Sequence, residues 1–196
     1  MSEPRVVARS RVAGAVLAVL LVTVAAVADR LSDPDSDYQL VSAPLGSTVA
    51  YESGRLQVSD VRVGSEVDEG TDQHLTKGLF VVVSVTLKAT GNDDVTVGNS
   101  QLLAEGGMTY LPAFSLEDTL TAHPGFEASR DLVYEVDPTR ITDLTLETWN
   151  SGFVYRYYQR NRTTLGITAA NAGRWAAAGA GQTVTTSHDA LTRALA

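Results

Sequence analysis

Apolar and polar residues alternate with a period of two along much of the chain between residues 51 and 162. The alternation is clearest at residues 78–89, where every second side chain from Val81 to Ala89 is apolar. The intervening positions begin with Phe80 and Val82 and turn polar toward Lys88. Alternate side chains of a strand lie on opposite faces of its sheet. We therefore predict a central β-strand over 78–89, with one face in the core and the other partly in water.

Shorter runs of the same kind surround this strand, and turn residues such as Gly91-Asn92 and Pro124-Gly125 separate them. The alternation slips at Ser59-Asp60, which predicts a β-bulge in the first strand. No helical pattern of about 10–15 residues lies between the runs, and this argues against a parallel sheet. Short strands at this spacing predict an all-β sandwich. Besides 78–89, the runs are 56–63, 95–97, 101–105, 108–111, 132–136, 144–149 and 153–159.

The first 28 residues have a different pattern. Arg5, Arg9 and Arg11 precede an uncharged run from Val12 to Ala28. This run is at the short limit for a membrane-spanning helix, and positive charge before it keeps the N-terminus in the cytoplasm. We predict that residues 12–28 bind the chain to the cytoplasmic membrane in a single pass, with the domain outside. Small residues at 26–28 also fit a signal-peptidase site, so secretion after cleavage following Ala28 is the alternative.

Two segments flank the alternating region. Residues 29–50 begin with Asp29, Asp33, Asp35 and Asp37, which predicts a solvated acidic linker. Residues 163–196 are rich in Ala and Gly, and we predict a short helix at 169–178, an edge strand at 182–186, and a frayed helix or disorder from 188 onward. The predicted parts are a cytoplasmic tip with a transmembrane or signal segment at 1–28, the linker at 29–50, the sandwich at 51–162 and a C-terminal extension at 163–196.

Cysteine content and charge distribution exclude several functions. Without cysteine, the chain has no disulfide, no thiolate metal site and no lipid on an N-terminal cysteine. The net charge is −8, with −14 in residues 29–149 and +4 in residues 150–196. Such an acidic body argues against nucleic-acid binding, which needs a basic face. The basic C-terminal part can bind the acidic body of its own chain or an anionic partner.

The strand pattern resembles a family of exported bacterial immunoglobulin-like domains that includes the mycobacterial immunogenic secreted antigen and many lipoproteins of unknown function. The resemblance covers roughly residues 54–149 and rests on three stretches: 54–58, 77–87 with its run of valines, and a Pro-Gly turn before a strand that ends in Asp137-Pro138. It implies an immunoglobulin-like sandwich outside the cytoplasm and implies no activity. The chain departs from the family in lacking the lipid-attachment cysteine and in its basic, aromatic stretch after Trp149.

Catalytic and metal-binding motifs give little signal. The sequence holds no nucleophile elbow, phosphate loop or dinucleotide fingerprint, and His74, His123 and His188 lie far apart. We therefore predict no enzyme activity and no cofactor. Acidic loops at 66–72 and 93–94 leave a weak cation site open as an alternative, because hard cations favour loop carboxylates. A secreted enzyme or enzyme inhibitor whose site the sequence does not display is the other alternative.

The stretch 153–162 has the most distinctive chemistry of the chain. On a strand, one face of this stretch mixes arginine with an aromatic residue, as recognition surfaces do: Arg156, Tyr158, Arg160 and Arg162. We predict that these four residues bind a partner, another protein or an envelope component, and that the domain is a non-catalytic binding or accessory module. The competing interpretation is a charged, self-paired sheet edge. The sequence leaves the oligomeric state open.

Overall fold

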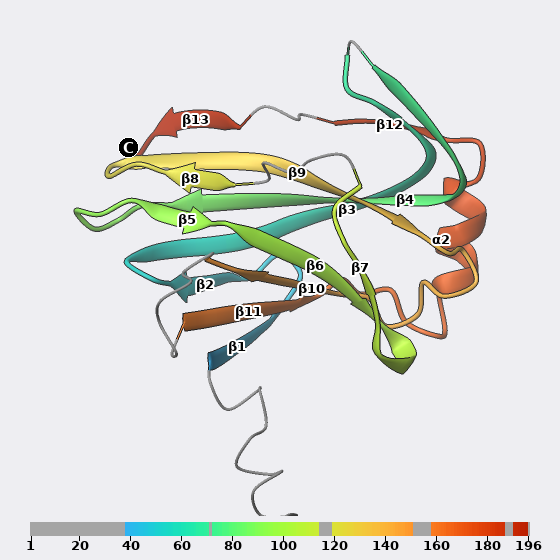
Figure 1. Cartoon of the computed structure of the whole chain (residues 1–196), viewed down its shortest axis with the longest axis horizontal. Helices are drawn as coiled ribbons and strands as arrows, with labels where there is room; N and C mark the ends of the chain where they lie inside the picture. The colour runs from blue at the N-terminus through green and yellow to red at the C-terminus, as the bar shows by residue number, and fades with distance from the viewer. Residues whose placement is uncertain (1–37, 71, 114–118, 151–157, 187–189, 196) are drawn as a thin grey trace, which may run out of the picture. The chain divides into compact units, whose positions relative to one another are not determined.

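The structure is a computed structural model that describes residues 38–70, 72–113, 119–150, 158–186 and 190–195. Two sheets face each other, and Figure 1 shows them as layers. In order across the first sheet lie β1 (Tyr38–Pro44), β11 (Tyr158–Thr164), β10 (Thr145–Trp149), β6 (Asn99–Ala104) and β7 (Met108–Tyr110). The second contains β12 (Thr183–Thr185), β3 (Gly54–Asp68), β4 (Gln73–Lys88), β9 (Phe126–Val136) and β13 (Leu191–Ala194), with β2 (Thr48–Tyr51) paired to β3.

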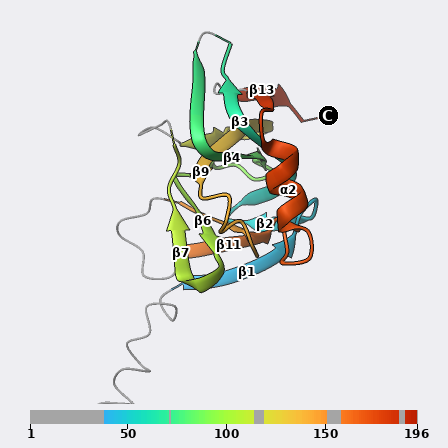
Figure 2. The same ribbon diagram turned by 90° about the vertical axis from the view of Figure 1, so that its right-hand side faces the viewer.

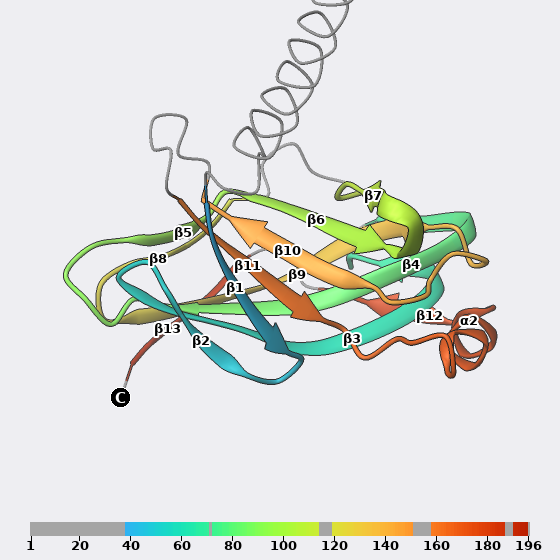
Figure 3. The same ribbon diagram turned by 90° about the horizontal axis from the view of Figure 1, so that it is seen from below.

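The remaining described elements are short. β5 (Val95–Val97) pairs with β8 (Leu120–Ala122), a 3-10 helix spans Glu105–Gly107, and α2 spans Ala172–Gly179. Seen from below, β1, β11, β10 and β6 lie side by side across the strands of the second sheet (Figure 3). The predicted β-sandwich with a short C-terminal helix is therefore confirmed. Among the described residues, no helix is long and apolar enough to cross a membrane. The predicted membrane segment at 12–28 lies outside those residues.

The predicted central strand is confirmed as β4, which has β3 on one side and β9 on the other. Its inward-facing side chains, Val81, Val83, Val85 and Leu87, are fully buried in the main core between the sheets. The predicted bulge is also present, because the pairing of β3 with β4 shifts register between Val58 and Asp60. These features could be predicted because alternate residues of a strand face the core and the water, and this leaves a period of two in the sequence.

The outer face of the second sheet carries a second apolar cluster, which consists of Val67, Phe80, Val82, Val133 and Val184. Val184 belongs to β12, which pairs in parallel with β3. Gly64 of β3 allows the close approach of this segment, since a Cβ there would lie 2.7 Å from the Gln182 carbonyl oxygen. The predicted edge strand at 182–186 is therefore present as β12, and it brings part of the predicted C-terminal extension into the second sheet.

Two other segments contain strands that were not predicted. The predicted frayed or disordered tail contains β13, which pairs with the edge of β9. The predicted linker at 29–50 contains β1 and β2, because apolar residues alternate from Val41 to Tyr51 and turn toward the core. Tyr51 is fully buried, and its hydroxyl donates to the Thr96 carbonyl oxygen. β1 thus begins at Tyr38, directly after the run of aspartates.

Charged side chains hold β13 at the sheet edge. Glu127 of β9 accepts hydrogen bonds from Lys88 of β4 and forms an ion pair with Arg193 of β13. The Lys88 ammonium group and then Arg193 lower the pKa of Glu127 below its ordinary 4.5. A lowered pKa means that the attraction is present above the unfolded-state pKa and is lost as pH falls through the folded-state value. The attraction that holds β13 should therefore be present at neutral pH and lost in acid.

The helix α2 closes one end of the sandwich, beside β3 (Figure 2). It begins three residues later than predicted, and Asn171 is at its N-cap position. The Asn171 side chain accepts a hydrogen bond from the Thr168 backbone N–H at 2.7 Å and so closes the preceding turn. At its other end, Gly179 packs on Val63 and Leu79 at distances that leave little room for a Cβ. Trp175 is partly buried against the main core.

Candidate functional site

The four residues predicted to bind a partner have different positions in the structure. Arg156 lies outside the described residues, and Tyr158 begins β11 with an undescribed side chain. Arg160 and Arg162 lie on the same outward face of β11, as the alternation predicts. Both guanidinium groups bind the carboxylate of Glu147 on the neighbouring strand β10, at 3.3 Å from Arg160 Nη1 and 3.0 Å from Arg162 Nε.

Glu147 is the centre of this cluster, which we call the Glu147 clasp. Its side chain is 1% exposed, whereas those of Arg160 and Arg162 are 20% and 29% exposed. Arg162 is directly opposite Glu147 on β11, and Gln101 is opposite it on β6 and also donates to the carboxylate. The Arg160 guanidinium lies 4.6 Å from the ring centre of its cross-strand neighbour Trp149.

In the clasp, two arginines neutralise a carboxylate of the same chain. A carboxylate withdrawn from water is costly unless charged and hydrogen-bonding groups surround it. Arg160, Arg162 and Gln101 supply those groups from β11 and β6, so the contacts tie three strands together. This geometry favours the self-paired interpretation for Arg160 and Arg162. Their predicted binding of a partner stays a prediction.

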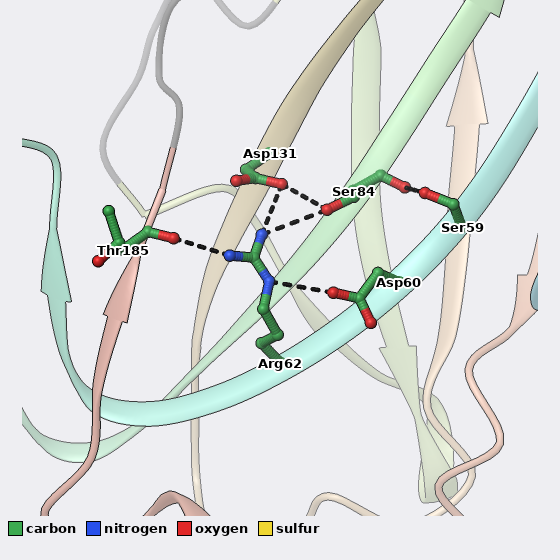
Figure 4. Close-up of polar contacts among 6 residues, drawn as sticks. All are labelled: Ser59, Asp60, Arg62, Ser84, Asp131 and Thr185. Carbon is green, nitrogen blue, oxygen red and sulfur yellow. Dashed lines mark hydrogen bonds and ion pairs between the residues drawn. The ribbon is translucent and has the colours of Figure 1, made fainter.

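A second polar cluster lies on the outer face of the other sheet, around Arg62 of β3 (Figure 4). The Arg62 guanidinium lies 2.7 Å from Asp131 of β9 and 3.2 Å from Asp60. It also donates to the Thr185 carbonyl oxygen of β12 at 2.7 Å. Ser84 of β4 accepts from Arg62 and donates to Asp131 at 2.6 Å. These contacts connect β12 to three other strands of the sheet.

An open groove of about 460 Å³ lies beside this cluster, and we call it the α2 groove. Its lining comes from β3, α2, and β12 with the residue before it. Valine, alanine and tryptophan side chains make much of the lining, and Arg62 is its ionisable residue. The lining residues are Val61, Arg62, Val63, Trp175, Ala178, Gln182, Thr183, Val184 and Thr185.

A smaller depression of about 360 Å³ lies next to the groove and shares two of its residues, Trp175 and Ala178. Asn171 and Arg174 complete its lining. Arg174 is exposed and takes part in no ion pair within the described part of the chain. Together the two hollows present the Trp175 side chain among apolar residues, with the exposed Arg174 on one side.

The described partners of the Ser84 hydroxyl belong to the Arg62 cluster. The hydroxyl donates to the Asp131 carboxylate and accepts from the Arg62 guanidinium. His74 lies beside Glu69, and His123 lies beside Asp94 at 3.0 Å on the surface. His188 falls outside the described residues. Across residues 38–70, 72–113, 119–150, 158–186 and 190–195, no group of three or more metal-binding side chains comes together.

Sequence reasoning missed the α2 groove because its walls are distant in the chain. Trp175 was part of a short predicted helix, and a single tryptophan in an Ala-rich helix does not show which strand it faces. The signal that could have indicated this site is the placement of Trp175 next to Arg174 in a segment otherwise rich in Ala and Gly. Aromatic and arginine side chains are enriched at recognition surfaces.

Comparison with known proteins gives no family. No family model and no curated protein matches the chain. An uncharacterized β-sandwich protein from Clostridium difficile 630 is similar with a TM-score of 0.44 and 7% identity, over 65% of this chain and 95% of that chain. The yjhA protein from Bacillus subtilis is similar with a TM-score of 0.48 and 17% identity, over 62% of this chain and 98% of that chain. These distant likenesses assign no activity, and the resemblance to the exported mycobacterial domains stays a prediction.

Proposed function

We propose that this protein is a non-catalytic binding module that recognises another protein of the cell envelope through the α2 groove. The observation that carries the proposal is the open, largely apolar groove with Trp175 in its wall and the exposed Arg174 beside it, which has no ion pair among the described residues. Concave apolar surfaces with a few polar groups are where proteins bind ligands, and tryptophan and arginine supply much of the binding energy at interfaces. The Glu147 clasp is then a stabilising element of the first sheet.

The groove suits binding better than catalysis. Its one ionisable lining residue, Arg62, already holds two carboxylates and donates to Thr185. Arginine stays protonated at physiological pH and so does not act as a general base. A hidden enzyme site would require a different location, and a cation site in the loops near Asp68 and Asp93 would require added ligands. Asp68 already accepts a hydrogen bond from the Gly70 backbone N–H.

The proposal places the domain on the outer side of the cytoplasmic membrane, held by residues 12–28, with secretion after cleavage following Ala28 as the alternative. Arg5, Arg9 and Arg11 support this orientation by the positive-inside rule. Alkaline phosphatase fused after Ala196 should be active, because the enzyme requires an oxidising compartment. An inactive phosphatase fusion together with an active cytoplasmic reporter would overturn the orientation.

The binding function is tested by capture of partners from detergent-solubilised membranes with the full chain and two matched variants. Ala178→Trp fills the groove, since Ala178 is exposed and lines it. Ala177→Trp adds the same side chain at an exposed neighbouring position that is outside the groove lining. We expect Ala178→Trp to lose at least about tenfold of the captured partner, which corresponds to about 1.4 kcal/mol of binding free energy. Ala177→Trp should capture as the wild type does.

The Tm of both variants is the control, and it should stay within a few degrees because surface changes alter stability by about 0.5 kcal/mol or less. Equal capture by the two variants would contradict recognition through the groove. Loss of capture on changing Arg160 and Arg162, with the Tm preserved, would place the recognition surface on β11 instead.

A further inference from the structure

The strand β3 has an unpaired stretch along its outer edge. One side of β3 pairs with β4 along most of its length. On the other side, β2 pairs with residues 54–57, and the Gly46 N–H donates to the Val58 carbonyl oxygen. Pairing on that side resumes at Ser65, whose backbone N–H donates to the Gln182 carbonyl oxygen. It continues with β12 at Glu66–Asp68. Within the described part of the chain, residues 59–64 have no backbone hydrogen bond on this side.

The α2 groove runs along this same stretch. Val61, Arg62 and Val63 form one wall of the groove, α2 forms another, and the segment leading into β12 forms the third. Gly64 is already covered by Gln182 and Val184, so the open length corresponds to residues 59–63. At about 3.3 Å per residue, this length accepts about five residues of an extended chain. An unpaired strand edge turns N–H and C=O groups outward from alternate residues, and these groups bind another extended backbone.

We propose that the occupant of the α2 groove is an extended segment of a partner protein that adds a strand to β3 between β2 and β12. This inference rests on the proposed function and specifies its ligand. Backbone hydrogen bonds to β3 supply affinity in this mode of recognition, and pockets for alternate side chains supply specificity.

The walls define the side chains that such a segment carries. Trp175 and Ala178 present apolar surface to one face of the added strand, which favours apolar residues at alternate positions. On the other face, Arg62 is already neutralised by Asp60 and Asp131. Arg174 has no ion pair within the described part of the chain, and it lines the neighbouring depression with Trp175 and Ala178, so it favours a carboxylate in a segment that reaches this depression. The partner segment therefore carries apolar residues at alternate positions together with acidic residues.

The test uses the full chain in detergent and a synthetic pentapeptide, Val-Glu-Phe-Glu-Val, acetylated and amidated at its ends. Two N-methylated versions carry methyl groups on the first, third and fifth amides or on the second and fourth. Only alternate N–H groups of an added strand point to its neighbour. Strand addition therefore predicts that calorimetry gives a Kd at least about tenfold weaker for one methylated version and nearly unchanged for the other. Ala178→Trp should abolish binding, and Ala177→Trp should not.

The remaining outcomes of the peptide and capture experiments test different claims. Binding that both methylations leave unchanged, or weaken equally, would overturn strand addition while leaving the groove as a side-chain binding site. Absence of peptide binding would also overturn strand addition, whereas the capture experiment decides the proposed function by itself. Capture that Ala178→Trp abolishes, with no peptide binding at all, would indicate an occupant of other chemistry, such as an envelope glycan.

Discussion

Replacing Arg160 and Arg162 together with methionine should lower the free energy of unfolding by about 3–5 kcal/mol, because it leaves a buried carboxylate without its charged partners. Glu147 is fully buried, and both guanidinium groups bind it in the folded state. Each single replacement keeps one guanidinium group on the carboxylate. The losses of unfolding free energy in the two single variants should therefore sum to less than the loss in the double variant, as expected of residues in one network. Urea denaturation monitored by circular dichroism measures these values.

A third substitution distinguishes the effect of losing the ion pairs from the effect of altered side-chain packing. Adding Glu147→Met to the double variant removes the stranded charge, and stability should return toward that of the wild type. A double variant that loses less than about 1 kcal/mol would show that the pairs behave as exposed surface ion pairs. In that case, loss of partner capture by the same variant would restore the interpretation of β11 as a recognition surface.

Val184→Asp should destabilise the domain by several kcal/mol, or unfold it, although Val184 lies in the segment predicted to be an extension outside the sandwich. Val184 packs in the outer apolar cluster with Phe80, Val82 and Val133. An unpaired charge in such a place costs several kcal/mol, against a total stability of about 5–15 kcal/mol for a typical domain. A thermal melt by circular dichroism reports the loss.

The matched control for this variant is Leu191→Asp in β13. Leu191 is 63% exposed, so the same change there should cost less than about 1 kcal/mol. If Val184→Asp were tolerated as well as Leu191→Asp, the C-terminal segment would not contribute to the fold. The second apolar cluster would then be stable without β12.

Local alternation was sufficient to predict β4 and the bulge at Ser59-Asp60, because each depends on which face of one strand meets water. It also placed Arg160 and Arg162 on a shared outer face. The same pattern could not indicate their partner. Glu147 is an isolated carboxylate between Leu146 and Thr148 in the sequence, and only the register of β10 against β11 places it opposite Arg162.

The C-terminal segment shows the other limit. β12 is three residues long and pairs in parallel with a part of β3 more than a hundred positions earlier in the chain. The sequence predicts an edge strand at 182–186, but so short a strand does not indicate its neighbour, which is decided by the apolar outer face that Val184 covers. β13 pairs with β9 although all four of its residues are exposed, so burial leaves no pattern in its sequence. The α2 groove depends on both the helix and β12 and could not be predicted from either one.

The proposed function depends most directly on contact between a partner and the α2 groove in the cell. A photoreactive diazirine side chain in place of Gln182 puts the label at an exposed position in the groove lining. The same label in place of Ala177 on α2 or Thr145 on the clasp face gives the controls. On illumination of intact cells, we expect a discrete protein adduct from position 182 that is absent or at least about tenfold weaker from positions 177 and 145. Equal labelling from all three positions, or an adduct from position 145 alone, would contradict recognition through the groove.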